Sequence, residues 1–109
     1  MKAGNTSVAI ADTIRKVCEE HAIRVKKMIL FGSRARNDYQ ESSDYDFIAI
    51  TDATIPHEKK MKLWLYIARE LGKTGISADI LFKTEEEYLE DTASTGKVAY
   101  YAVKEGISV

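Results

Sequence analysis

The sequence contains a single cysteine, Cys18, and a single proline, Pro56, among its 109 residues. One cysteine excludes a disulfide within the chain and is typical of proteins kept in a reducing compartment, so we expect the cytoplasm. No apolar run is long enough to span a bilayer, and the first residues lack the apolar segment of a secretion signal. We therefore expect no membrane contact.

The chain also lacks an excess of charge of either sign. It has 16 Lys and Arg against 17 Asp and Glu, a formal net charge of -1. No general positive field attracts nucleic acid, so direct nucleic-acid binding is not expected. Repeats, low-complexity tracts and linkers are missing, and 45% of the residues are hydrophobic. We expect one globular domain over residues 1–109.

Hydrophobic spacing predicts alternating helices and strands. An amphipathic helix is expected over residues 7–22, followed by strands at Val25–Phe31 and Tyr45–Thr51. A second helix should begin near Pro56 and end at residue 71, with Gly72 as its C-cap. A third strand is expected over residues 76–82.

The last third of the chain begins with a helix start signal. Thr84 and Glu87 have the spacing of a capping box. Gly96 should break the helical region that follows, Gly106 should end it, and residues 107–109 should add a short edge strand. The predicted order is α-β-β-α-β-α, which indicates an α/β (α+β) fold in which a small mixed sheet is flanked by helices.

Two carboxylates stand at the start of the second strand. Because side chains alternate along a strand, Asp44 and Asp46 point the same way, with their Cα atoms about 7 Å apart. Two like charges that close resist burial, and a divalent cation such as Mg²⁺ removes the repulsion. A solvated turn is the alternative. A calcium loop of the EF-hand type is excluded, because the position that needs glycine is Ala49.

A third carboxylate lies within the apolar stretch ISADILFKT. A charge in the middle of such a strand, here Asp79, is costly unless it is paired or binds a metal. Pairing with Lys or Arg, or a place at an exposed edge, remains the alternative. If this strand lies beside that of Asp44 and Asp46, three carboxylates meet at one rim, enough to hold the two metals of phosphoryl-transfer chemistry.

A Gly-Ser turn follows the first strand. Gly32 lets the backbone approach a ligand, Ser33 offers a hydroxyl group, and Arg34 and Arg36 add positive charge suited to phosphate. A plain turn with solvated arginines is the alternative. The turn is neither a Walker A loop nor a dinucleotide fingerprint, because the further glycines and the lysine are missing. If the first and second strands pair antiparallel, the end of the first strand lies near the start of the second, and this turn lies close to Asp44 and Asp46.

Gly32-Ser33, ten intervening residues and Asp44-Tyr45-Asp46, with Asp79 on a later strand, resemble the minimal nucleotidyltransferase domains of the DNA polymerase β superfamily. The resemblance runs from the first helix to AYYAVKEGISV. It implies the polymerase-β-like fold and ATP or another nucleoside triphosphate as substrate. It also implies two Mg²⁺ ions as cofactors. It implies metal ligation and catalysis by Asp44, Asp46 and Asp79, with Asp79 a candidate base for the attacking hydroxyl group. The implied nucleotide-binding residues are Gly32, Ser33, Arg34, Arg36 and Ser43.

The chemistry implied by this resemblance is attack on the α-phosphate with loss of pyrophosphate. Short members of the family look like antitoxins paired with a HEPN-domain ribonuclease toxin, to which some transfer AMP at a tyrosine. The resemblance therefore implies a HEPN toxin as partner. Two alternative functions remain. One is a module that neutralises a toxin by covering it, and the other is a nucleotidyltransferase that acts on RNA or a small molecule. Asn37 and Tyr45 depart from the usual glycine and aliphatic residue.

Overall fold

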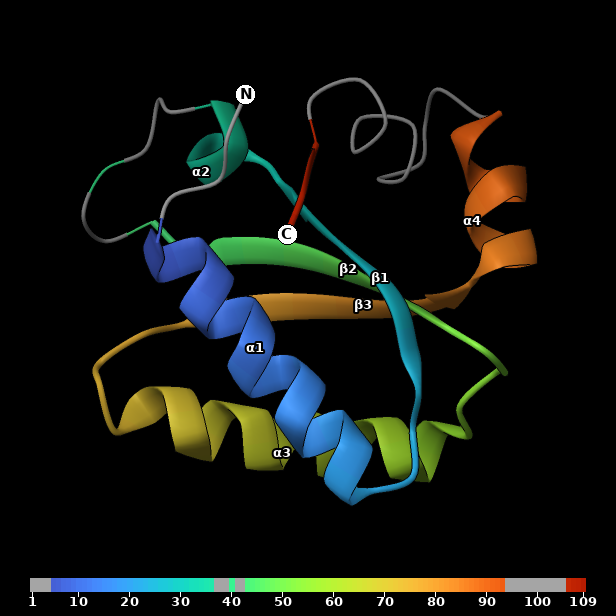
Figure 1. Cartoon of the computed structure of the whole chain (residues 1–109), viewed down its shortest axis with the longest axis horizontal. Helices are drawn as coiled ribbons and strands as arrows, with labels where there is room; N and C mark the ends of the chain where they lie inside the picture. The colour runs from blue at the N-terminus through green and yellow to red at the C-terminus, as the bar shows by residue number, and fades with distance from the viewer. Residues whose placement is uncertain (1–4, 37–39, 41–42, 94–105) are drawn as a thin grey trace.

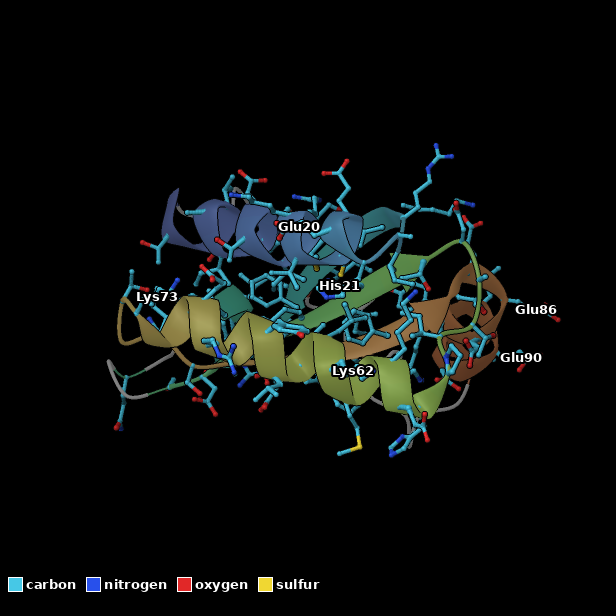
Figure 2. The ribbon with its side chains drawn as sticks, turned by 90° about the horizontal axis from the view of Figure 1, so that it is seen from below. Glu20, His21, Lys62, Lys73, Glu86 and Glu90 are labelled. Carbon is cyan, nitrogen blue, oxygen red and sulfur yellow. The ribbon has the colours of Figure 1, made fainter. Side chains whose placement is uncertain are left out.

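The computed structural model describes residues 5–36, 40, 43–93 and 106–109. Within them a four-stranded sheet has the order β3-β2-β1-β4. Helices α1 (Asn5–Glu20) and α3 (His57–Gly72) lie side by side on one face of the sheet (Figures 1 and 2). Two shorter helices, α2 (Ser33–Arg36) and α4 (Glu85–Thr92), follow β1 and β3. The predicted mixed α/β fold is confirmed, and α2 is a helix that the predicted order lacked.

Strand pairing places both predicted halves of the site at one end of the sheet. β1 (Val25–Phe31) runs antiparallel to β2 (Tyr45–Thr51), so the end of β1 lies beside the start of β2. β3 (Ala78–Thr84) runs parallel to β2 on its other side. β4 (Ile107–Ser108) pairs antiparallel with β1, as the sequence predicted for a short edge strand. The bounds of β1 and β2 are those predicted.

The turn between α3 and β3 differs from the prediction. Gly72 is the last helical residue rather than the C-cap, which is Lys73 with ordinary right-handed geometry. The left-handed residue comes later, at Gly75 with φ +72°, and the amide of Ile76 still donates to the carbonyl of Leu71 at 3.1 Å. This longer turn uses residues assigned to the strand, so β3 begins two residues after the predicted start and runs to Thr84.

Successive side chains of each strand point to opposite faces of the sheet, so the core is divided into two clusters, one on each face. The larger cluster joins α1 and α3 to the side chains of the strands that face them, and it includes the buried residues Ile10, Ile14, Met28, Leu30, Phe47, Leu63 and Ile67. The smaller cluster on the opposite face contains Ile29, Ile48 and Ile50, with Phe31, Leu81 and Tyr88 packed against it. Asp44 and Asp46 share the parity of Ile48, so their carboxylates belong to this second face.

α1 begins and ends two residues before its predicted bounds, and His21 lies just beyond it. Its ring stacks on Tyr66 of α3 with centroids 4.8 Å apart, between the two helices (Figure 2). Cys18 is fully buried nearby, and burial raises the pKa of its thiol to about 11. Both residues therefore have packing roles.

The predicted capping box at the start of α4 is confirmed. The amide of Glu87 donates to Thr84 Oγ1 at 3.2 Å, and the amide of Thr84 donates to Glu87 Oε1 at 2.9 Å. The predicted break at Gly96 lies outside the described residues. No helix in the described part of the chain is long and apolar enough to cross a membrane.

Candidate active site

Two of the three predicted carboxylates stand at the same level of neighbouring strands. Asp46 on β2 and Asp79 on β3 are register partners in the parallel pair. Asp44 precedes Asp46 by two residues and is exposed. Asp79 is exposed as well, because it is only the second residue of β3 and lies at the rim of the sheet. The expectation that Asp79 sits in the middle of a buried strand is therefore wrong, and of the alternatives the exposed edge is the one observed.

The surroundings of Asp46 disfavour the charged form of its carboxyl group. Burial raises the pKa of its carboxyl group, and the negative charges of Asp79 and Asp44 raise it further. Arg36 acts in the other direction and lowers this pKa. The side chain is partly buried, and the charges around it favour the protonated form. A cation at this position would relieve the strain on the ionised form.

Gly32 at the end of β1 leaves room for the Asp46 carboxylate. Its φ is +76°, and a Cβ atom built there would come within 2.5 Å of Asp46 Oδ2. No side chain fits in this space without a shift of the carboxylate. The Gly32 carbonyl accepts hydrogen bonds from the amides of Ala35 and Arg36, both at 3.1 Å, which begin α2. The turn that carries Ser33 is thus held directly against Asp46.

Arg34 braces the segment that leads into Asp44. Its Nε and Nη2 atoms donate to the carbonyl of Ser43 at 3.2 and 3.0 Å. Its guanidinium lies over the ring of Tyr45, 4.3 Å from the centroid, in a cation–π contact. The Ser43 hydroxyl accepts a hydrogen bond from the amide of Gln40 at 3.0 Å. Tyr45, which departs from the usual aliphatic residue, therefore has a role that its place between two acids did not reveal.

Cavities flank the acids on the surface of the described residues. One of about 540 Å³ reaches Asp46 and Asp79, and its walls include Trp64 and Ala68 of α3. A smaller one of about 200 Å³ lies beside Arg34, Ser43 and Asp44. Trp64 is half-buried: it packs against the core and also lines the first of these cavities. A further cavity of about 500 Å³ lies at the opposite end of β1 and is lined by residues such as Arg15 and Arg24.

The donor set at this edge suits a hard cation. Three carboxylates supply the oxygen ligands that Mg²⁺ prefers. Neighbouring strands are about 4.8 Å apart, so rotation of the side chains is enough to aim Asp46 and Asp79 at one ion. In the conformation seen across residues 5–36, 40, 43–93 and 106–109, no three acidic, histidine or cysteine side chains are grouped closely enough to hold a metal. The residue types and the register of Asp46 and Asp79 fit the ion.

Comparison with known proteins defines the class. Residues 12–105 match the family described as "Polymerase beta, Nucleotidyltransferase". A curated relative from Methanocaldococcus jannaschii, named "Putative protein adenylyltransferase", is 42% identical over 82 residues, which are 75% of this chain and 77% of the relative. The fold and these matches define a nucleotidyltransferase domain. The chain belongs to the polymerase beta nucleotidyltransferase family.

Solved structures show the same fold at low sequence identity. A toxin–antitoxin crystallised with AMP-PNP superposes with a TM-score of 0.62 and 16% identity, covering 89% of this chain and 69% of its own. A mutant form of the toxin–antitoxin MntA-HpeT gives a TM-score of 0.61 at 16% identity, covering 91% of this chain and 70% of its own. The predicted polymerase-β-like fold is confirmed.

Proposed function

We propose that this chain transfers AMP from ATP, with Mg²⁺, to a tyrosine of a partner protein, and that the partner is a HEPN-domain ribonuclease toxin that the modification silences. The observation that carries the proposal is the meeting of the Gly32 turn with Asp46 and Asp79 at one sheet edge. The adenylyltransferase name of the 42% identical relative and the toxin–antitoxin structures of the same fold support it.

Asp44, Asp46 and Asp79 are the residues that would hold Mg²⁺. When bound, the ion supplies neutralisation of phosphate charge and orientation of the reacting oxygens. The pKa of Asp46 is raised first by burial and then by the charges of Asp79 and Asp44, and this supports the assignment, because a bound cation would stabilise the ionised carboxylate. A solved toxin–antitoxin structure of the same fold was crystallised with AMP-PNP, an analogue of ATP, and this supports ATP as the nucleotide in the proposal.

The other site residues would either bind the phosphates of the nucleotide or hold the acids in place. The absence of a side chain at Gly32 lets a phosphate approach the backbone beside Asp46, and Ser33 presents a hydroxyl group at the same turn. Arg36 contributes positive charge that already acts on Asp46. Arg34 and Ser43 were expected to contact nucleotide. Their hydrogen bond to each other supports a bracing role that holds Asp44 in place. Asp79, which is exposed at the rim of β3, is the residue we assign to take the proton of the attacking hydroxyl group.

A label-transfer assay tests the proposal. The protein and a candidate toxin are incubated with Mg²⁺ and ATP labelled at either the α- or the γ-phosphate. Transfer of the α-label alone, lost in the Asp44→Asn/Asp46→Asn protein, is the expected result. Asp52→Asn serves as the matched control, because Asp52 is an exposed acid at the other end of β2. Transfer of the γ-label would mean a kinase-like reaction and would contradict the mechanism.

The covering module is the second candidate, and exposed apolar residues on α3 favour it. Met61 and Leu65, one helical turn apart on α3, are 56% and 58% exposed, and neighbouring apolar side chains of this kind could be covered by a partner protein. The Asp44→Asn/Asp46→Asn protein separates the two candidates. If it binds the toxin and still neutralises it without label transfer, covering is the mechanism. If binding survives and neutralisation is lost, the enzymatic proposal is supported.

A further inference from the structure

The exposed side of α3 carries apolar and basic residues next to each other. Met61 and Leu65, the exposed apolar pair, lie one helical turn apart. Lys62 and Arg69 are also exposed, three residues before and four residues after Leu65, so each lies beside it on the helix. We call Met61, Lys62, Leu65 and Arg69 the basic face. Within α3 as a whole, four basic residues stand against two acidic ones.

The exposed side of α4 has a similar layout with the opposite charge. Leu89 is 64% exposed, more than any other large hydrophobic residue in the described part of the chain. Glu86 comes three residues before it and Glu90 directly after it, and both are exposed. We call Glu86, Leu89 and Glu90 the acidic face. α4 contains five acidic residues and no basic one.

Most charges of the two faces are not used within the described part of the molecule. Glu85, on the same helix as the acidic face, pairs with Lys26 at 2.9 Å. Lys62, Glu86 and Glu90, in contrast, have no ion pair or side-chain hydrogen bond with any other described residue. Figure 2 shows Glu86 and Glu90 at one end of the molecule and Lys62 along α3, apart from them. The two faces therefore do not meet within one molecule.

We propose that the acidic face of one copy of this chain docks on the basic face of a second copy. Leu89 would lie against Met61 and Leu65 at the centre, and the carboxylates would lie beside the basic side chains around them. This layout matches the usual division of an interface into an apolar core and a polar rim. A two-fold dimer forms the contact twice, because each copy supplies one face of each kind.

A second copy accounts for both faces at once. A toxin that covers α3 would explain the exposure of Met61 and Leu65, but not that of Leu89 among the acids of α4. The formal net charge of the whole chain is only -1, so two copies meet without strong overall repulsion while their oppositely charged faces attract. The inference goes beyond the proposed function and does not depend on it.

Sedimentation equilibrium of the protein alone, without nucleotide or toxin, tests the contact. We expect a concentration-dependent equilibrium between monomer and dimer. Its Kd should rise by about tenfold or more when NaCl is raised from about 0.05 to about 0.5 M, because salt screens exposed charges. A protein that stays monomeric up to about 1 mM would overturn the proposal. A dimer whose Kd does not respond to salt would overturn it as well.

Charge reversal on each face distinguishes this contact from any other. Lys62→Glu/Arg69→Glu and Glu86→Lys/Glu90→Lys should each be monomeric alone, because faces of like charge then oppose each other. An equimolar mixture of the two proteins should form a heterodimer, since both contacts of the two-fold pair again join opposite charges. Dimers of either protein alone, or a mixture that does not associate although both proteins unfold thermally like wild type, would overturn the proposal.

Two further variants complete the test. Asp12→Lys/Glu19→Lys changes two exposed acids of α1 and alters the net charge as much as the change on α4, so it should associate like wild type. Leu89→Ser leaves every charge in place and removes the apolar centre of the acidic face. It should raise the Kd for self-association by about tenfold or more. An unchanged Kd for Leu89→Ser, or an equal loss for the α1 variant, would contradict docking through α4.

Discussion

Asp46 and Asp79 face each other at the same level of two parallel strands, with no residue of the sheet between them. Strand partners of like charge destabilise a sheet. The negative charge of Asp79 is one reason why the pKa of Asp46 is raised. Such an arrangement lowers stability in the free protein and is typical of a site that awaits a counter-charge.

The stability of the protein should depend on pH through Asp46. Because its folded-state pKa is raised above the ordinary value of 3.8, the folded protein binds the proton more tightly than the unfolded chain. The contribution of Asp46 to the free energy of unfolding is therefore most favourable below pH 3.8. This contribution falls as the pH rises from 3.8 through the folded-state pKa. Asp46→Asn removes this loss, so the variant should gain in melting temperature over wild type at neutral pH more than at a pH below 3.8.

The same variant should lose transfer activity about a hundredfold or more, since even the outer partners of metal ligands contribute ten- to a hundredfold. Asp52→Asn is again the control, with no change expected in activity. Added Mg²⁺ should stabilise the wild type at neutral pH and have less effect on Asp46→Asn, measured by thermal unfolding. Equal stabilisation of both proteins by Mg²⁺ would show that the ion binds elsewhere.

Gly32 and Gly75 form a matched pair for substitution. Both have positive φ, +76° and +72°, so alanine at either position should cost about 1–2 kcal/mol in the free energy of unfolding. Only at Gly32 would the new Cβ meet Asp46 Oδ2, at 2.5 Å, whereas nothing lies within 4 Å at Gly75. We expect Gly32→Ala to abolish transfer and Gly75→Ala to retain it. Urea unfolding and the label-transfer assay measure the two effects, and equal activity of the variants would contradict the role of Gly32.

Arg34→Lys should destabilise the protein although it keeps the charge. A lysine ammonium is a single point donor and does not reproduce two hydrogen bonds to the Ser43 carbonyl together with the contact on Tyr45. We expect a loss of about 1–2 kcal/mol in urea unfolding. Arg24→Lys is the control, because the Arg24 side chain is 82% exposed and its contact to Asp52 is 3.8 Å long. A loss as large at Arg24 would argue against the bracing role of Arg34.

The capping box of α4 should give the opposite pH dependence to that of Asp46. The backbone hydrogen bond from Thr84 lowers the pKa of Glu87 below its ordinary 4.5. The stabilisation is present above pH 4.5 and is lost as the pH falls through the folded-state pKa. Glu87→Gln should therefore be less stable than wild type at neutral pH and should approach it at low pH. Thr84→Ala should cost about 1 kcal/mol at neutral pH by loss of the N-cap. A constant difference between Glu87→Gln and wild type at all pH values would contradict the assignment.

Local sequence patterns predicted most of the secondary structure, because each pattern has a local cause. β1 and β2 have the predicted bounds, since apolar, β-branched and aromatic runs are bounded by polar or glycine residues. The errors fell where no hydrophobic period marks the boundary of an element. The turn after α3 ends at Gly75 rather than Gly72, because the Leu71 carbonyl accepts hydrogen bonds from both Thr74 and Ile76. α2 was missed, because a four-residue helix has no hydrophobic period to read.

The acids, the glycine and the spacing that lets Asp44 and Asp46 share a strand face could all be read from the chain alone, because alternation along a strand is a property of the backbone. The exposure of Asp79 at the rim, level with Asp46, could not, since the register between β2 and β3 depends on how the whole sheet packs around the intervening α3. Folding also placed the Arg34 guanidinium on the Ser43 carbonyl and the Trp64 indole along a groove. Those contacts join segments that no local pattern relates, so packing rather than sequence spacing creates them.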